Sequence, residues 1–283
     1  MLKKFVFRLF SYIRIVKNNF RAIRFPYKKR MNGRIYVMGN GPSLNASIDF
    51  LLSKNNKSTF IAVNDFAVSD IYNMVKPRYY IMVDNAYWDD ACNSNPRDIA
   101  LRETVFSNLV KKTDWELSVF IPDYAYKSGC FKQLINNCKI DIIPFNRFEI
   151  KAEKTDFYFN NLLKNNTGYF NNVLANAIYC SINLGFDELC ILGAEHSWTE
   201  DIRVNDKNQV CTIKKHFFEN DSDLIPWQKS DGGIFSMAEI LNALTHHFQA
   251  YELLAEYAER NHVKVYNMTR GSFIDAFERR NLD

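Results

Sequence analysis

Short runs of β-branched and aromatic residues alternate with stretches of helical hydrophobic spacing along most of this 283-residue chain. The runs predict strands at 34–38, 59–63, 79–83, 117–121, 140–143, 188–192 and 262–266, and the helical spacing covers 44–52, 169–184, 235–261 and 274–279. Strands that alternate with helices typically form a parallel sheet, because a crossover helix returns the chain to the same edge. We therefore predict an α/β fold with a doubly wound, mostly parallel sheet.

The composition excludes several other classes of protein. The chain is 47% hydrophobic and 24% charged, which supports a sizeable core and is atypical of disordered or collagen-like sequences. Its six cysteines form no Cys-x-x-Cys pair and no zinc-ligand spacing, so we expect reduced thiols in a cytoplasmic protein. Cys180 and Cys190 lie in apolar runs and are predicted to be small core residues.

The first 34 residues carry eleven Lys or Arg and no acid. Subtracting them from the 36 bases of the chain leaves 25 bases against 32 acids, so we do not expect the body to bind nucleic acid. Apolar residues recur between these bases at the spacing of an amphipathic helix. Its longest uncharged run, 9–13, is too short to span a membrane, and no signal-peptide cleavage pattern is present.

Two interpretations of this basic helix stay open. One is attachment to an anionic membrane surface, which would make the protein cytoplasmic and peripheral on the inner face of the membrane. The other is packing on the body or on a second subunit, so a homo-oligomer stays open as well.

Polar residues directly follow most of the predicted strands. They are Asn40, Asn64, Asp65, Asp84, Asn85, Glu195, His196 and Asn267. Because the carboxyl ends of parallel strands meet at one edge, where open α/β sheets bind ligands, these side chains predict a shared crevice. Asn and Asp are also ordinary turn formers, which is the alternative explanation.

The loop Gly39-Asn40-Gly41-Pro42-Ser43 follows the first strand and opens a helix. Its glycines let the backbone approach a ligand closely, and a helix N-terminus favours a phosphate. The loop lacks the full dinucleotide fingerprint and the Lys of a Walker loop. It predicts nucleotide or phosphate binding, with Ser43 as a plain N-cap as the alternative.

A long polar segment, about 198–234, separates the strand 188–192 from the longest helix. It contains Trp198, His216 and Trp227, and structureless segments of this length are usually lids or binding loops. The predicted organisation is a basic amphipathic helix over 1–33 and a Rossmann-like domain over 34–283, with the lid inside it.

At these residues the chain resembles bacterial CMP-sialic-acid-dependent sialyltransferases of glycosyltransferase family forty-two. The resemblance rests on Gly-Asn-Gly-Pro-Ser-Leu at 39–44, on the strand that ends in Asn64, and on 166–168, 186–193 and 265–277. The runs 195–198 and 216–218 look more like a related group of uncharacterised surface-polysaccharide proteins. That group is akin to motility-accessory factors and to a pterin diphosphokinase. The matches lie in pieces between about 34 and 280.

The resemblance implies which residues hold the donor. By resemblance, Asn40, Gly41, Ser43 and Asn64 would hold the CMP portion, and Thr167 and Gly168 would line the cytidine side. Asp84 or Asn85 takes the place of an Asn that contacts the donor near the reaction centre. The predicted nucleotide site also includes Gly39, Pro42, Asp65 and Gly193. Ser197 and Arg203 fall near the places where the family binds the departing phosphate. The family is metal-independent, so the resemblance implies neither a metal nor another cofactor beside the CMP-sugar donor.

Four side chains are candidates for acid–base work: Glu195, His196, His216 and His247. His196 has the best position, because it follows a strand at the ligand-binding edge. His246 and His247 are adjacent on a predicted helix, so at most one faces the crevice, and His216 lies in the predicted lid. Glu195 either acts as the base, orients His196 or binds a sugar hydroxyl. Packing is the alternative role for each histidine.

The leading hypothesis is a glycosyltransferase of surface polysaccharide or glycolipid synthesis, such as capsule or lipopolysaccharide. It would move a sialic-acid-like or Kdo-like sugar from a CMP-activated donor to a glycan or lipid-linked acceptor, with a His or Glu taking the acceptor proton. One alternative is a pterin or nucleotide diphosphokinase, which would need magnesium and carboxylates such as Glu195, Asp65 and Asp84. Another is a non-catalytic nucleotide-binding protein of an assembly complex, because fold alone does not decide function.

Overall fold

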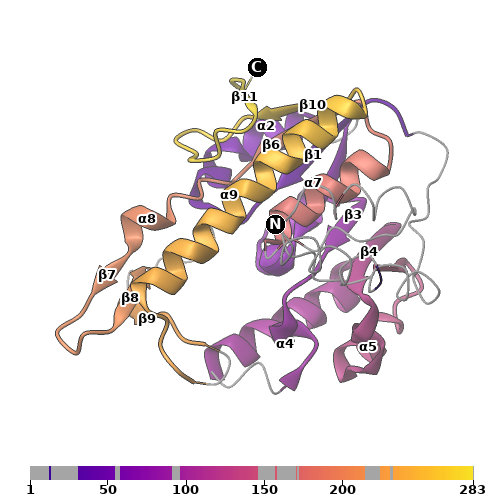
Figure 1. Cartoon of the computed structure of the whole chain (residues 1–283). Coiled ribbons are helices and arrows are strands. Elements are labelled where there is room, and N and C mark those ends of the chain that lie inside the picture. Colours follow the sequence, from indigo (N-terminus) through magenta and orange to yellow (C-terminus); the bar gives the residue numbers. More distant parts are fainter. Residues whose placement is uncertain are drawn as a thin grey trace.

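The computed structural model describes residues 13, 31–54, 58–90, 96–145, 157, 170, 172–213, 224–229 and 232–282. In this part of the chain, eight strands form one sheet in the order β11-β10-β6-β1-β2-β3-β4-β5 (Figure 1). The strands are β1 (Arg34–Met38), β2 (Thr59–Val63), β3 (Tyr79–Ile81), β4 (Leu117–Pro122), β5 (Ile140–Phe145), β6 (Glu188–Leu192), β10 (Lys264–Asn267) and β11 (Glu278–Arg279). Every pair in this sheet is parallel, which confirms the predicted α/β class.

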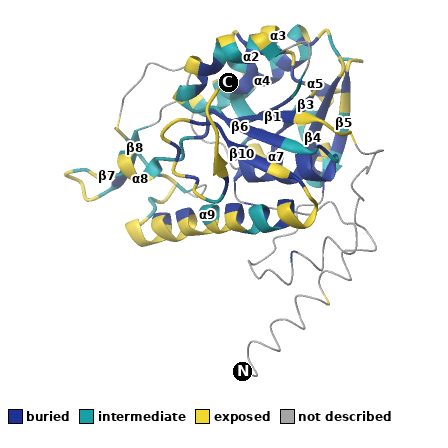
Figure 2. Ribbon diagram, turned by 90° about the horizontal axis from the view of Figure 1, so that it is seen from above, coloured by how far each residue is buried: buried dark blue, intermediate teal, exposed yellow. Residues whose placement is uncertain are grey.

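Helices cover both faces of the sheet (Figure 2). One face carries α7 (Val173–Asn183) and α9 (Met237–Arg260), and the other carries the 3₁₀ helix η1 (Pro42–Ser47), α2 (Ile48–Lys54), α3 (Tyr72–Val75), α4 (Pro96–Lys112) and α5 (Gly129–Leu134). Alternate residues of β1 therefore enter different cores: Ile35 packs with the α7–α9 layer and Tyr36 with the opposite one. Covering on both faces explains why the central strands are apolar throughout.

Local capping fixes the ends of the two helices beside the sheet. Asn172 caps α7, and Gly185 follows its last turn with a positive φ of 84°, as predicted. α9 begins with a capping box between Ser236 and Glu239. A hydrogen bond from Lys229 holds the pKa of the Glu239 carboxyl at about 2, well below its usual value.

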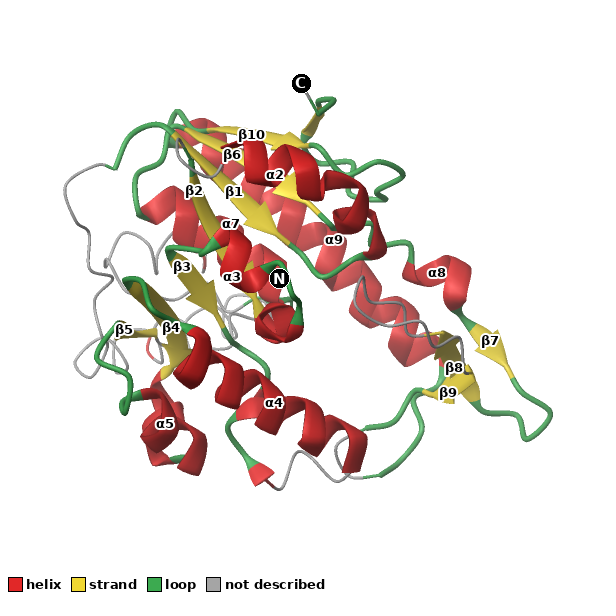
Figure 3. Ribbon diagram, turned by 180° about the vertical axis from the view of Figure 1, so that it is seen from behind, coloured by secondary structure: helices red, strands yellow, loops and turns green. Residues whose placement is uncertain are grey.

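A second, small sheet lies within the segment predicted to be a lid. It consists of β7 (Arg203–Val204), β8 (Val210–Ile213) and β9 (Leu224–Pro226), all antiparallel, and follows the short helix α8 (Trp198–Asp201). Figure 3 shows these elements grouped at the end of α9, away from the large sheet. Val210 packs there with Ile240 and Leu244. The expectation of a structureless segment is wrong for its described residues, because strands of two to four residues are too short to show a hydrophobic period.

Three other expectations need correction. The polar stretch 86–114 has no clear hydrophobic period and predicts loops or short helices, but it contains the 17-residue helix α4. Its buried residues Val105, Phe106 and Leu109 all lie in the second half of α4, which explains the weak period. The predicted final helix 274–279 is a loop that ends in β11. α7 begins at Val173 rather than at 169. Cys180 and Cys190 are buried free thiols, as predicted.

The predicted basic helix over 1–33 lies almost wholly outside the described residues. Within the described part, no helix is both long enough and apolar enough to cross a bilayer.

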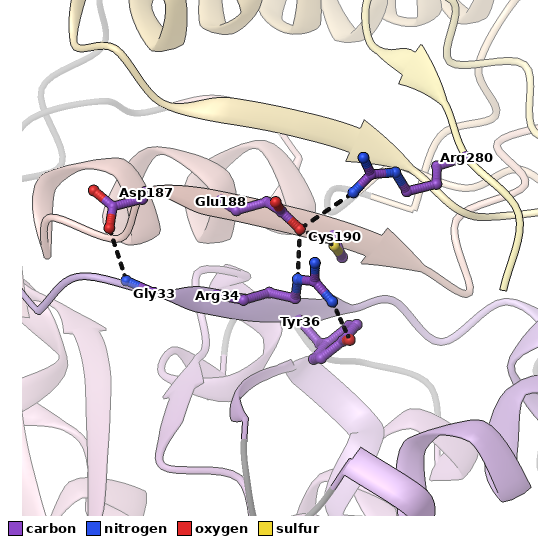
Figure 4. Close-up of polar contacts among 7 residues, drawn as sticks. All are labelled: Gly33, Arg34, Tyr36, Asp187, Glu188, Cys190 and Arg280. Carbon is purple, nitrogen blue, oxygen red and sulfur yellow. Dashed lines mark hydrogen bonds and ion pairs between the residues drawn. The ribbon is translucent and has the colours of Figure 1, made fainter. Parts of the chain in front are cut away.

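A charged network joins the amino ends of the central strands to the C-terminal segment (Figure 4). Glu188 accepts from Arg34 at 2.5 Å and from Arg280 at 3.4 Å. The Arg280 guanidinium also lies 3.7 Å from the centre of the Tyr266 ring, a cation–π contact. These contacts tie the segment after β11 to β10 and, through the Arg280 side chain, to Glu188 at the amino end of β6.

Candidate functional site

A cavity of about 360 Å³ lies at the carboxyl ends of β1, β2 and β6. β1 is the point where the strand order reverses, with β2 on one side and β6 on the other, which is where open α/β sheets bind ligands. The described walls consist of Gly39, Asn40, Gly41, Pro42, Val63, Asn64, Asp65, Asn172, Val173, Leu174, Gly193, Glu195, His196, Ser197, Trp198, Asp201, Thr212, Ile213 and Trp227. Ten of these are residues that the sequence proposed for the site, and α8, β8 and Trp227 of the predicted lid supply one wall.

The loops after β1 and β6 touch each other through glycines. The Gly41 N–H donates to the Gly193 carbonyl at 2.8 Å. A Cβ on Gly39 would lie 2.2 Å from the Gly193 oxygen, far inside van der Waals contact. The first glycine is therefore required by loop-to-loop packing, in addition to any approach of a ligand.

Glu195 occupies the place where the sequence predicted a phosphate. Its Oε1 accepts from the backbone N–H of Ser43 at 2.5 Å. A Cβ on Gly41 would lie 1.6 Å from its Oε2. The helix that opens here is the six-residue 3₁₀ helix η1, and Glu195 already occupies its Ser43 amide. The loop thus fixes a carboxylate at the cavity, and phosphate binding at a helix N-terminus is not supported.

Orphaned polar atoms surround the same loop. The Asn40 amide donates to the Val63 carbonyl at 3.1 Å, which directs its Oδ1 away from that carbonyl. That Oδ1, the Oδ1 of Asn64 and the Oγ of Ser43 are buried and have no hydrogen-bond partner among the described residues. Asn64 also holds a positive φ of 44°. Because buried polar atoms are nearly always paired, these oxygens make the loop beside the cavity a candidate for binding a water or a ligand that donates hydrogen bonds.

His196 is held from two sides. Its ring stacks on Trp198 with centroids 4.1 Å apart, and its Nδ1 lies 3.0 Å from the Tyr251 hydroxyl. Burial disfavours the charged form and lowers the pKa of His196 to about 3, with the nearby His247 as a smaller cause. The side chain keeps partial access to the cavity, yet its imidazole is neutral at physiological pH.

Two residues that the sequence reasoning missed stand behind His196. Asn172 donates to the Tyr251 hydroxyl at 2.6 Å, and its own Oδ1 accepts from the Leu174 N–H at 2.9 Å. An Asn before an apolar helical run signals an N-cap, so the position of Asn172 was recoverable, although its contact with Tyr251 was not. Tyr251 carries no sequence signal, because it is one buried aromatic residue inside a 24-residue helix.

The described walls of the cavity are acidic. They include Asp65, Glu195 and Asp201, and they include no Lys or Arg. The Asp65 carboxylate accepts from the Tyr87 hydroxyl. In the described part of the chain, no group of three or more His, Cys, Asp or Glu side chains is arranged to hold a metal ion.

The remaining sequence candidates are spread more widely. Ser43 touches the site through Glu195, and His247 packs its ring against Trp198 at 5.4 Å. Asp84 caps the short turn after β3, and Asn85 accepts from the Tyr124 hydroxyl. Arg203 is exposed and donates to the carbonyls of its neighbours at 200 and 202, so the structure does not bring it into the cavity. Thr167, Gly168 and His216 lie outside the described residues.

A second cavity, of about 560 Å³, lies beyond the ends of β3 and β4. Its walls include Trp88, Tyr124, Arg102 and Lys127. The Asp65–Tyr87 hydrogen bond joins the two sites, because Asp65 lines the first cavity and Tyr87 lines the second.

Comparison with one solved structure supports this fold. No family model and no curated protein matches the sequence. Among solved structures, the chain is similar to the MAf glycosyltransferase of Magnetospirillum magneticum AMB-1, with 12% identity and a TM-score of 0.55 over 92% of this chain and 35% of that one. It is also similar to the apo α-2,3-sialyltransferase of Campylobacter jejuni, with 15% identity and a TM-score of 0.41 over 91% and 83%. The chain thus spans about a third of the length of the Magnetospirillum protein.

Proposed function

We propose that the protein is a glycosyltransferase that takes its sugar from a CMP-activated donor. The acceptor is a glycan or lipid-linked molecule of surface polysaccharide or glycolipid synthesis. The observation that carries this proposal is the set of hydrogen-bond acceptors around the cavity at the switch point of the sheet: the orphaned oxygens of Asn40 and Asn64 beside the carboxylate of Glu195. The fold shared with the Magnetospirillum glycosyltransferase supports it.

Cytidine matches an acceptor-rich cavity better than uridine does. Cytosine presents an exocyclic amino group that donates hydrogen bonds, whereas uracil presents a carbonyl oxygen at the same position. Placed against Asn40 and Asn64, the amino group is satisfied and the uracil oxygen is repelled. We assign Glu195 to the ribose hydroxyls, because the Ser43 amide holds its carboxylate fixed at the cavity.

The proposed reaction is an in-line displacement. The acceptor hydroxyl attacks the anomeric carbon, the bond from that carbon to the phosphate oxygen breaks, and CMP departs with the bonding electron pair. Of the four acid–base candidates, Glu195 is tied to the loop, His196 is bound to Tyr251, and His247 packs behind Trp198. His216 therefore stays our candidate for the base that takes the acceptor proton.

The second cavity suits the sugar end of the substrates. Its aromatic residues, Trp88 and Tyr124, provide apolar faces for a pyranose ring, and Arg102 and Lys127 offer positive charge to an acidic sugar. Arg102 is already paired with Asp90 at 2.7 Å, which leaves Lys127 as the first residue to test. Lys127→Gln should raise the donor KM for an acidic sugar and leave CMP affinity unchanged.

For the basic segment 1–33 we propose peripheral attachment to the inner face of the membrane, where a lipid-linked acceptor would be carried. Deleting residues 1–29 should release the protein from anionic vesicles in a sedimentation assay. Full-length protein that ignores such vesicles would contradict attachment and leave the transferase proposal untouched.

The proposed function is tested by measuring the rate of CMP release from CMP-N-acetylneuraminic acid and from CMP-Kdo. Water acts as the acceptor in this assay, because the natural acceptor is not identified. Asn64→Gly removes the amide and keeps the positive φ, so it should raise the donor KM about tenfold for the loss of one hydrogen bond. Asn208→Gly is the matched control, because this exposed turn residue has a similar φ of 55°. Equal turnover of UDP-sugars, or an unchanged KM in Asn64→Gly, would contradict the proposal.

A further inference from the structure

We propose that Asn172 and Tyr251 hold His196 as a neutral imidazole whose proton is on Nε2, so that His196 donates a hydrogen bond into the cavity and accepts no proton there. This revises the sequence-based interpretation of His196 as a general acid or base. The assignment of the proton follows from a chain of three hydrogen bonds, each of which leaves only one direction for the next.

The first hydrogen bond fixes the amide of Asn172. The backbone N–H of Leu174 is a donor only, so the side-chain atom that it contacts at 2.9 Å is the oxygen of Asn172. The amide nitrogen must then be the atom that faces the Tyr251 hydroxyl, 2.6 Å away. The usual ambiguity between the two ends of an Asn amide is thereby removed.

The second step fixes the Tyr251 hydroxyl. Its oxygen accepts from Asn172, and the side chain is completely buried between α7 and α9. The hydroxyl proton therefore needs a partner inside the protein, and the other neighbouring atom is Nδ1 of His196, at 3.0 Å. If Nδ1 carried a proton instead, two donors would face one oxygen and the hydroxyl proton would be buried unpaired, which costs about 1–3 kcal/mol.

The third step places the proton of His196. A neutral imidazole that accepts at Nδ1 carries its proton on Nε2. The two ring nitrogens point in widely different directions, so Nε2–H points away from Tyr251 and the core around it. Stacking on Trp198 and a positive φ of 52° fix the ring in this orientation, at the wall of the cavity.

The role of this donor rests on the proposed function. A neutral N–H group can donate to the departing phosphate, and none of the described residues that line the cavity is a Lys or an Arg. An Nε2–H held in place before the reaction provides one at no cost of reorientation. A general base at the same position would need a free lone pair on Nε2, which this tautomer lacks. Tyr251 and Asn172 are then positioning residues.

The tautomer can be measured without any substrate. In the full-length protein labelled with ¹⁵N-histidine, long-range ¹H–¹⁵N correlation spectra distinguish a protonated ring nitrogen from an unprotonated one. The His196 signals are identified by their loss in His196→Asn. We expect a single neutral species with the proton on Nε2 near neutral pH. A proton on Nδ1, or a doubly protonated ring at that pH, would overturn the proposal.

An isosteric variant, Asn172→Asp, should reverse the direction of the hydrogen bonds between residue 172, Tyr251 and His196. In Asn172→Asp the carboxylate still caps Leu174 but can only accept, so the Tyr251 hydroxyl donates to it and must accept from His196. The proton of His196 should therefore move to Nδ1. Asn183→Asp is the control, because Asn183 lies on the same helix and accepts from the Tyr257 hydroxyl at 2.7 Å, a hydrogen bond that a carboxylate also accepts. It should leave the His196 tautomer unchanged.

A second variant covers the case in which Asn172→Asp does not fold. Tyr251→Phe keeps the ring and removes the hydroxyl, so the single tautomer should be replaced by exchange of the proton between both nitrogens. Unchanged His196 signals in either folded variant would refute the relay, that is, the control of the His196 tautomer by Asn172 through Tyr251. Turnover is a separate measurement. Because Asn172→Asp removes the proton from Nε2, kcat for CMP release should fall by about 10²-fold, with the donor KM little changed. The predicted tautomer in a protein that releases no CMP would contradict the proposed function and leave the relay intact.

Discussion

Acidification should destabilise this fold through His196. The folded pKa of about 3 is far below the ordinary value of about 6.5, because burial disfavours the imidazolium. Between these two values the unfolded chain binds a proton that the folded chain does not. The stability that the neutral ring contributes is therefore complete above about pH 6.5 and is lost as the pH falls toward 3.

The size of this loss follows from the pKa window. Each pH unit below 6.5 costs about 1.4 kcal/mol while the folded imidazole stays neutral. Lowering the pH from about 7.5 to about 5 crosses about one and a half such units, which predicts a loss of about 2 kcal/mol. The number depends only on a folded pKa well below 5, a condition that the burial of the ring and the adjacent His247 both favour.

The assay is urea unfolding at several pH values in this range, with wild type compared with His196→Asn. Asn tolerates the positive φ of 52°, and it does not titrate. His246→Gln is the control, because His246 is exposed on α9 and faces no such burial. The variant at 196 should lose about 2 kcal/mol less than wild type on acidification, and the control should behave as wild type. Equal losses in wild type and His196→Asn would refute a neutral, buried His196.

Three further changes test the surroundings of the site. Gly41→Ala places a methyl group 1.6 Å from the Glu195 carboxylate, so it should cost about 1–3 kcal/mol of stability and abolish CMP binding by calorimetry. Glu195→Gln keeps the shape of the side chain but replaces the carboxylate that accepts from the Ser43 N–H with a neutral amide. It should lower the free energy of unfolding by about 1 kcal/mol and should also weaken CMP binding. Ser236→Ala breaks the capping box of α9 and should cost about 1 kcal/mol in denaturant unfolding with unchanged CMP affinity, which an altered affinity would contradict.

Seven of the eight strands in the large sheet could be predicted from the sequence, because each is either a continuous apolar run or ends in a polar turn, and only the two-residue β11 was missed. The strands of the second sheet could not, since Arg203–Val204 and Leu224–Pro226 are shorter than one detectable period. The final helix was wrongly predicted because Ile274 and Phe277 have helical spacing, although both are anchors that bury a loop against the core.

The site was predictable where residues follow strands directly, as Asn40, Asn64 and Glu195 do. The relay behind His196 was not predictable, because Asn172 and Tyr251 are 79 residues apart and meet only when α7 packs on α9. The chemistry of the glycine loop was also hidden. Its pattern indicates an anion at Ser43, and the structure shows that the anion is Glu195 of the same chain.

Recognition of cytidine in the cavity between β1, β2 and β6 is the property on which the proposed function depends. The most direct test is calorimetric titration of the full-length protein with CMP, and with UMP, CDP, UDP, GDP and ATP, each with and without magnesium. We expect CMP to bind at least about tenfold more tightly than UMP, independently of magnesium, with weaker binding in Asn64→Gly and unchanged binding in Asn208→Gly. Equal affinity for CMP and UMP, or binding of ATP only with magnesium, would contradict it.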